Sequence, residues 1–292
     1  MKIRQWPVFV ALIPAELVVL LALAAPRPPA TTEIRVFAPS SMHAGISADS
    51  ALTQKHRKAA AKAPPKAADV PFQAGEALDY RVSWTAFPMA ATVRLSVAER
   101  RNLYGWDAWH FRAVASTVPP VRSIFSIDDE FDSYTDAITF AGRRYEMYLD
   151  ELGRNEKSVM ELTPQGAVPR GPVATVIVSP GTRDPLGLLE SLRAYDWDHN
   201  GELRVPVFDG KNLYEVQASR AMPDSQITVP AGTFSTKHVA IQLFSAGNEV
   251  PHTHFDLWLG HDAARIPVAM EADIPIGTFR VELTGLHPGE TK

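Results

Sequence analysis

The residues best suited to chemistry lie near the C-terminus, where His252, His254 and Asp256 alternate along the chain. Alternate residues of a β-strand point to the same face, so a strand here would present two imidazoles and one carboxylate together. These ligands suit zinc or non-haem iron. Same-face neighbours lie about 6.5–7 Å apart, however, and a metal usually recruits a ligand from another element. A solvated strand face therefore competes with a metal site and is the simpler interpretation.

Other catalytic patterns are missing from the sequence. The acidic stretch at residues 128–132 resembles a calcium loop in composition only, because the EF-hand order of ligands with its central Gly is missing. The sequence contains no Gly-x-Ser-x-Gly elbow, phosphate loop, dinucleotide fingerprint or His-Glu-x-x-His motif. We therefore expect no cofactor and no enzymatic activity.

Aromatic side chains are the candidates for an apolar binding site. Cavities in curled sheets are mostly apolar with a few polar groups, which suits large rings on strands. The pocket-lining candidates are Trp84, Trp109, Phe111 and Tyr148. Ordinary packing in the core is the competing interpretation for each of them.

The elements that would position these residues are mainly strands. In residues 76–84, Leu78, Tyr80, Val82 and Trp84 alternate with polar residues, which predicts a half-buried strand. After a break at residues 87–88, residues 91–97 repeat the pattern and predict the second arm of a hairpin. Further strands are expected at residues 108–118, 126–134, 144–151, 157–162, 173–178, 203–208, 212–221, 225–229, 238–244, 252–259, 266–271 and 277–286.

One segment, residues 184–195, has the signals of a helix. Asp184 can cap it, Pro185 suits its first turn, and Leu188 and Leu192 belong to an apolar stripe at helical spacing. A sheet of about a dozen strands must curl or close. We therefore predict a mainly β fold: an antiparallel sheet curled into an open β-barrel or β-spiral, with one short covering helix.

Several residues are expected to be structural turns. Asp209 and Gly210 form a two-residue hairpin signal, because Gly tolerates a positive φ. Pro230 and Gly232 mark a second turn. Asp262 and Arg265 flank a third, fastened by a salt bridge or by capping of backbone amides.

The chain divides into three parts. Lys2 and Arg4 precede an apolar run, so residues 1–26 are expected to be a signal peptide or an N-terminal membrane anchor formed by residues 7–26. Residues 27–69 are rich in Ala, Pro and Lys and are expected to be a disordered linker. Residues 70–288 form the β-rich domain. The location expected is the periplasm, either in soluble form after cleavage or anchored to the inner membrane.

Charge and cysteine content exclude some classes of partner and of covalent attachment. Residues 1–69 carry nine Lys and Arg against four Asp and Glu, and the remaining residues carry 20 against 29. An acidic domain is a poor nucleic-acid binder, because phosphate contacts need clustered basic residues. The absence of Cys excludes disulfides and a lipoprotein anchor.

Motifs in the domain resemble a known family. They are the Gly75-Glu76 and Tyr80 opening, the helix from Asp184 to Arg193, and residues 203–216, 229–234, 257–268 and 277–283. These features resemble the bacterial domain-of-unknown-function family 3108, over roughly residues 72–286. The resemblance implies an exported envelope protein with a curled sheet, and it carries no catalytic residues.

Three functions are consistent with the sequence. The leading hypothesis is a non-enzymatic periplasmic protein that binds a lipid, another amphiphilic ligand or an envelope protein and supports envelope integrity. The second is a metal-dependent enzyme that uses His252, His254 and Asp256. The third is a structural module that pairs an exposed strand edge with a partner.

Overall fold

The computed structural model describes residues 70–164 and 173–289. The expected signal or anchor at residues 1–26 and the expected linker at residues 27–69 lie outside the described residues. Among the residues described, no helix is both long enough and apolar enough to cross a membrane.

The described chain is built from strands, with one α-helix and one 3-10 turn. The strands are β1 (Ala77–Trp84), β2 (Phe87–Leu103), β3 (Trp106–Thr117), β4 (Asp128–Asp136), β5 (Gly142–Glu151), β6 (Arg154–Pro164), β7 (Ala174–Val178), β8 (Glu202–Phe208), β9 (Leu213–Val229), β10 (Gly232–Ser245), β11 (Asn248–Glu249), β12 (His254–Gly260), β13 (Pro267–Ile274) and β14 (Gly277–His287). The 3-10 turn is η1 (Val121–Ser123) and the helix is α2 (Pro185–Ala194).

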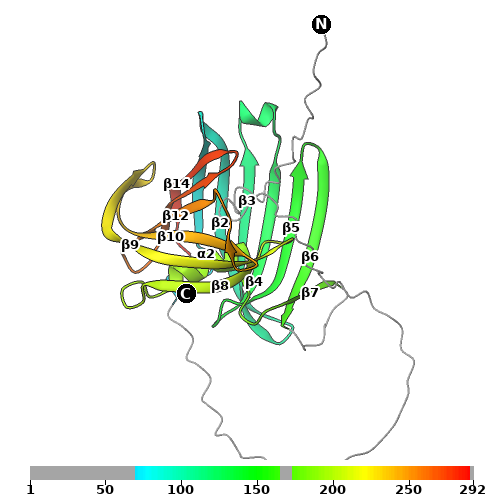
Figure 1. Ribbon diagram of the computed structural model, residues 1–292. Helices are drawn as coiled ribbons and strands as arrows, with labels where there is room; N and C mark the ends of the chain where they lie inside the picture. The colour runs from blue at the N-terminus through cyan, green and yellow to red at the C-terminus, as the bar shows by residue number, and fades with distance from the viewer. Residues whose placement is uncertain (1–69, 165–172, 290–292) are drawn as a thin grey trace, which may run out of the picture.

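Strands that follow one another in the chain lie next to one another in the sheet. The order is β7-β6-β5-β4-β3-β2-β1-β14-β13-β12-β10-β9-β8, with β11 paired to β10. Every pair is antiparallel except β6 and β7. A bridge between Arg183 and Val207 brings the two ends of the sheet together. The sheet curls into a nearly closed barrel (Figure 1), which confirms the predicted fold class.

The period-two pattern separates the inside of the barrel from the outside. In β1, Leu78, Tyr80 and Val82 are buried, whereas Asp79 and Arg81 are partly exposed. The buried apolar faces of the strands form one large core, beside a small second cluster of Leu103, Ala108 and Tyr134.

Two predicted strand breaks are bulges. Pro88 lies inside β2, opposite a register shift between Val82 and Trp84. The gap between the strands predicted at residues 212–221 and 225–229 contains Pro223, which lies inside β9, opposite a register shift between Thr236 and His238. A bulge leaves a residue without a ladder hydrogen bond, so proline fits there without ending the strand.

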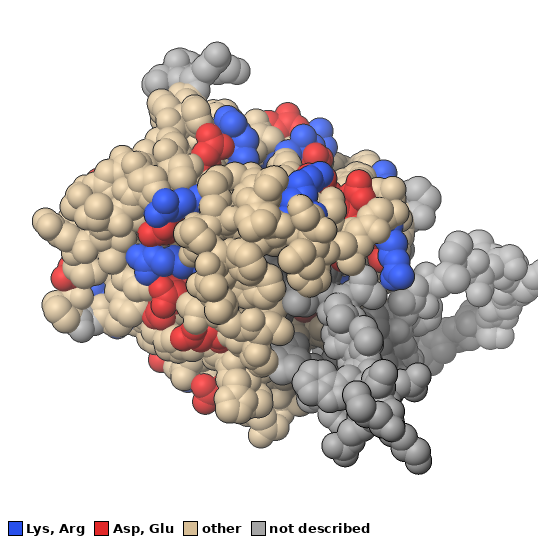
Figure 2. Space-filling model, turned by 90° about the horizontal axis from the view of Figure 1, so that it is seen from above, with Lys and Arg blue, Asp and Glu red and all other residues tan. Residues whose placement is uncertain are grey.

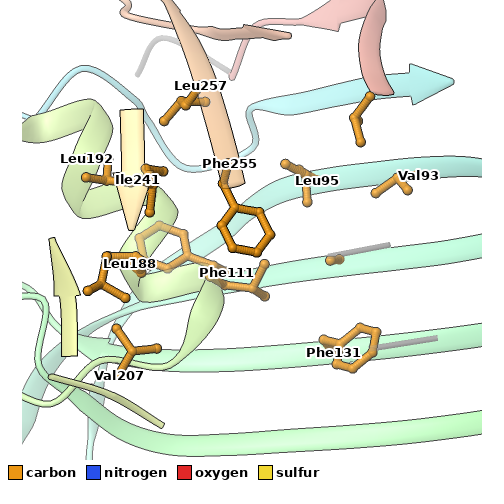
Figure 3. Packing of buried hydrophobic residues seen from close by; sticks show 14 of the residues in the cluster. Val93, Leu95, Phe111, Phe131, Leu188, Leu192, Val207, Ile241, Phe255 and Leu257 are labelled. Carbon is orange, nitrogen blue, oxygen red and sulfur yellow. The ribbon is translucent and has the colours of Figure 1, made fainter. Parts of the chain in front are cut away.

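Helix α2 plugs one end of the barrel. Asp184 caps its N-terminus by accepting a hydrogen bond from the Gly187 amide at 2.9 Å. Leu188 and Leu192 point from the helix toward side chains of the surrounding strands (Figure 3). The predicted helix and its apolar stripe are therefore confirmed.

The barrel has two different ends. We call the lower end in Figure 1, with α2, the start of β1 and the end of β14, the helix end. We call the upper end, with the β1–β2, β5–β6 and β13–β14 turns and η1, the hairpin-tip end.

Candidate ligand groove at the helix end

Residues from three distant parts of the chain meet at the C-terminus of α2. Arg193 Nη1 lies 2.8 Å from Glu76 Oε1, just before β1, and 3.0 Å from Glu190 Oε2 on the same helix. Arg193 Nη2 donates to the Ala264 carbonyl, in the β12–β13 turn, at 3.1 Å. The guanidinium also lies over the Phe72 ring, 5.4 Å from its centroid. Arg193 therefore ties the helix to the start of β1 and to the β12–β13 turn.

This charge cluster is withdrawn from solvent. The Arg193 side chain has an exposed fraction of 0%. Burial raises the pKa of the Glu190 carboxyl to about 7, although the Arg193 charge acts in the opposite direction. A buried cation needs such partners, because an unpaired charge in a low-dielectric interior is strongly destabilising.

Arg265 completes the end of the helix. Its Nη1 donates to the carbonyls of Arg193, Ala194 and Tyr195 at 3.3, 3.1 and 3.1 Å. These carbonyls have no partner within the helix, and a cation is favourable at a helix C-terminus. The start of β13, just after this turn, is held by Tyr80, whose hydroxyl donates to the Pro267 carbonyl at 2.8 Å.

A groove of about 640 Å³ opens beside this cluster. Its polar side chains are Gln73, Glu76 and His287, and the rest of its lining is apolar or glycine. The other lining residues are Val70, Pro71, Phe72, Leu78, Ala263, Ala264, Ile266, Leu286, Pro288 and Gly289. The groove is therefore an apolar channel with a carboxylate at one point of its wall.

The predicted aromatic pocket residues do not gather in one place. Trp109 and Phe111 are buried in the core, where their rings lie 5.2 and 5.5 Å from that of Phe72, a groove residue. Trp84 lies at the hairpin-tip end, stacked 5.6 Å from Phe279. Of the four candidates, only Trp109 and Phe111 lie near the groove, where they pack against its lining residue Phe72.

The prediction that Tyr148 lines an internal pocket is wrong. Its β5 neighbours Met147 and Leu149 belong to the core, so the alternation of the strand turns Tyr148 outward. There its hydroxyl donates to Glu146 at 2.5 Å, and Lys157 lies over its ring.

The three predicted turns are present, with one correction. Phe208 pairs with Leu213, so the turn at Asp209 and Gly210 contains four residues rather than two. Asp209 Oδ1 accepts from the amides of Lys211 and Asn212, and Gly210 has a φ of 102°.

The other two turns follow the expected chemistry. Pro230 lies between Val229 and Gly232, which pair directly, and Gly232 has a φ of 138°. Asp262 Oδ1 accepts from the Arg265 amide at 3.1 Å, so it caps the turn rather than forming a salt bridge with Arg265.

His252, His254 and Asp256, the candidate metal ligands, do not share one strand face. β12 begins at His254, and His252 precedes it in a turn with a φ of 55°, so strand alternation does not reach His252. Asp256 instead contacts His238 at 2.5 Å and His254 at 3.0 Å. Within residues 70–164 and 173–289, no group of three or more His, Asp or Glu is arranged to hold a metal ion.

The sequence does not predict the groove, because the residues that line it are far apart in the chain. Glu76 and Arg193 are separated by 117 positions, and no local pattern joins them. The available signal was a charged residue in the last turn of an apolar helix. Both residues also fall in the motifs that carried the family resemblance.

Comparisons with known proteins agree with this fold. The family model "Protein of unknown function (DUF3108)" matches residues 79–284, and the chain belongs to this family. The comparison with curated proteins gives no match.

A solved structure shares the architecture. A β-barrel-like protein of domain of unknown function DUF1849 from Brucella abortus matches with a TM-score of 0.50 and 14% identity, covering 75% of this chain and 100% of that chain. A protein from Parabacteroides distasonis, described as a candidate lipoprotein, matches with a TM-score of 0.35 and 12% identity, covering 75% of this chain and 98% of that chain. At 14% identity the likeness to the Brucella abortus protein concerns the fold alone.

Proposed function

We propose that this member of the DUF3108 family is an exported, non-enzymatic protein that binds an apolar or amphiphilic envelope molecule in the helix-end groove. The observation that carries the proposal is the groove itself, which has about 640 Å³ of space and a mostly apolar lining. This size lies within the range of about 300–1,000 Å³ typical of ligand pockets.

The lining defines the chemistry of the ligand. Phe72, Leu78, Ile266 and Leu286 offer apolar surface to a hydrocarbon chain. Gln73 can hydrogen-bond a polar head, which places head and chain at different points of one groove. A single-chain lipid or a related amphiphile has this division.

We assign the groove no reaction. The Glu76 carboxylate, its acidic group, already pairs with Arg193 at 2.8 Å. The pair fixes α2 against β1, so its removal would disturb the fold before any chemistry. This arrangement suits a binding site with a rigid wall.

Export is supported by the N-terminal sequence. Lys2 and Arg4 precede the apolar residues 7–26, the order found in secretory signals and in membrane anchors. Either outcome would place the barrel outside the cytoplasm, in the periplasm of a two-membrane cell, where amphiphilic envelope molecules occur. A role in envelope integrity would follow from binding such molecules.

A filled groove provides the test. Leu286→Trp adds bulk in the groove, and Leu213→Trp is its matched control, because both leucines are 39% exposed and only Leu286 lines the groove. We expect a fluorescent fatty acid to bind the wild type and the control equally, and the Leu286→Trp variant at least about tenfold more weakly. Equal binding by all three proteins would exclude the groove.

Strand pairing with a protein partner stays a prediction. In the described sheet β7 pairs only with β6, and Ile177 on β7 is exposed. Crosslinking from position 177 in intact cells would identify a partner at this edge.

A further inference from the structure

We propose a second interaction surface, at the opposite end of the barrel: the hairpin-tip end rests on a lipid bilayer and inserts four apolar side chains into its interface. These are Met89, Ile124, Leu152 and Ile276, which are 45%, 61%, 48% and 39% exposed. We call them the tip residues. The surface is separate from the groove and from its ligand.

The tip residues come from four separate segments that meet at one end. The Leu152 amide, in the β5–β6 turn, donates to the Ser126 carbonyl at 2.8 Å, beside the segment that carries Ile124. The Ile276 carbonyl accepts from Trp84 Nε1 at 3.1 Å. The exposed side chains therefore belong to a connected row and are not scattered over the barrel.

An aromatic cluster supports this row from below. Trp84 stacks on Phe87 and Phe279 with centroids 5.9 and 5.6 Å away, and it meets Phe125 edge-on at 6.2 Å. Trp84 is partly exposed, with an apolar ring and a polar N–H. Side chains of this kind favour the boundary between water and lipid.

The segment that presents Ile124 is held in place. Arg122 Nη1 donates to the carbonyls of Thr117 and Ile127 at 3.3 and 3.4 Å. The Ile124 amide closes η1 by donating to the Val121 carbonyl at 2.9 Å. These hydrogen bonds fix the backbone of the turn, with the Ile124 side chain exposed.

Two ion pairs balance charges close to the tip residues. Arg122 pairs with Asp128 at 2.5 Å, and Arg280 pairs with Glu271 at 2.7 Å. Seen from this end, the molecule is mostly uncharged, with basic and acidic side chains next to one another (Figure 2). Binding would therefore depend on apolar contact, with little dependence on salt or anionic lipid.

The length of the chain before the barrel argues for a bilayer as the occupant. The apolar residues 7–26 suit a membrane, and 43 positions, residues 27–69, separate them from Val70. At about 3.3 Å per extended residue, such a length can span about 140 Å, enough for either end of the barrel to reach the same bilayer.

The absence of cysteine makes a direct test possible. The full chain is prepared with Ile124→Cys or Leu152→Cys and labelled with an environment-sensitive fluorophore. The matched control is Tyr104→Cys, because Tyr104 is 65% exposed in the β2–β3 turn at the helix end. Each protein is reconstituted in phosphatidylcholine vesicles that contain lipids with nitroxide-labelled acyl chains.

We expect the nitroxide lipids to quench the tip labels about threefold more than the Tyr104 label, in low and high salt and with or without phosphatidylglycerol. Adding Leu286→Trp to the labelled proteins leaves this difference unchanged, because it fills the groove only. Equal quenching at the two ends overturns the proposal. So does a tip-label change that follows protein concentration without vesicles, which would identify a second copy as the occupant.

Discussion

Each end of the barrel holds residues whose burial is unusual for their type. At the helix end Arg193 and Glu190 are buried, whereas at the hairpin-tip end Ile124 and Leu152 are exposed. The helix end must hold a separate element inside the opening, and ion pairs with fixed geometry determine where it sits. The hairpin-tip end is made by turns between paired strands, so its side chains are free to serve an outside surface.

Residues at the helix end serve packing within the protein, whereas the tip residues serve binding to an outside surface. Residues of the helix end contact one another across 117 positions of sequence, and their loss should affect folding. The side chains of the tip residues are exposed, so their loss should affect binding without affecting folding. Substitutions at the two ends can therefore confirm or refute the distinction.

The largest effect is expected from Arg193→Met. The substitution leaves the carboxylates of Glu76 and Glu190 without their buried cation, which should lower the free energy of unfolding by about 3–5 kcal/mol. Urea denaturation measures it. The control is Arg94→Met, because Arg94 is exposed and pairs with Asp79 at 3.3 Å, and its loss should cost less than about 1 kcal/mol. Similar costs for both variants would contradict the anchoring role of Arg193.

A smaller effect is expected where the helix touches the sheet. A Cβ at Gly187 would lie 2.6 Å from Thr135 Cγ2, whereas a Cβ at Gly201 would meet nothing within 4 Å. Gly187→Ala should therefore destabilise by about 1–3 kcal/mol, despite the better helix propensity of alanine. Gly201→Ala should change stability by less than about 0.5 kcal/mol. Thermal unfolding of the pair checks whether α2 packs as closely as described.

The pH dependence of stability tests the buried carboxyl. Burial raises the pKa of Glu190 to about 7 in the folded protein, from an ordinary value of 4.5. The folded state then binds the proton more tightly, so Glu190 lowers stability as pH rises from about 4.5 to about 7. Glu190→Gln should remove this part of the slope, on the order of 1–2 kcal/mol between pH 5 and pH 7. Parallel wild-type and variant profiles would place Glu190 in a wetter environment.

The smallest effect on stability is expected at the tips. Ile124→Ser and Leu152→Ser remove exposed apolar surface, so the free energy of unfolding should change by less than about 0.5 kcal/mol. Chemical denaturation measures this directly. A loss above about 1.5 kcal/mol would show that these residues contribute to the core.

The sequence predicted the local elements well because each has a short-range cause. The alternation of Leu78, Tyr80 and Val82 and the cap at Asp184 depend on neighbours in the chain, and the structure has both. Breaks predicted at Pro88 and Pro223 were wrong because bulges accept proline. The alternation assumed for His252 was wrong because the residue lies in a turn.

The candidate site could not be predicted from patterns among neighbouring residues of the chain. The groove joins the start of β1, the end of β14 and the β12–β13 turn, which become neighbours only when the barrel curls. The placement of Tyr148 could not be predicted, because ring type alone does not tell which face of a strand a residue occupies. The strand register supplies that information.

The central claim is that the groove holds an amphiphile, and mass spectrometry of molecules extracted from the purified full chain tests it most directly. We predict one amphiphile in roughly equimolar amount with the wild type and the Leu213→Trp control, and its loss from the Leu286→Trp variant. Equal amounts in all three proteins, or no amphiphile in the wild type, would contradict the claim.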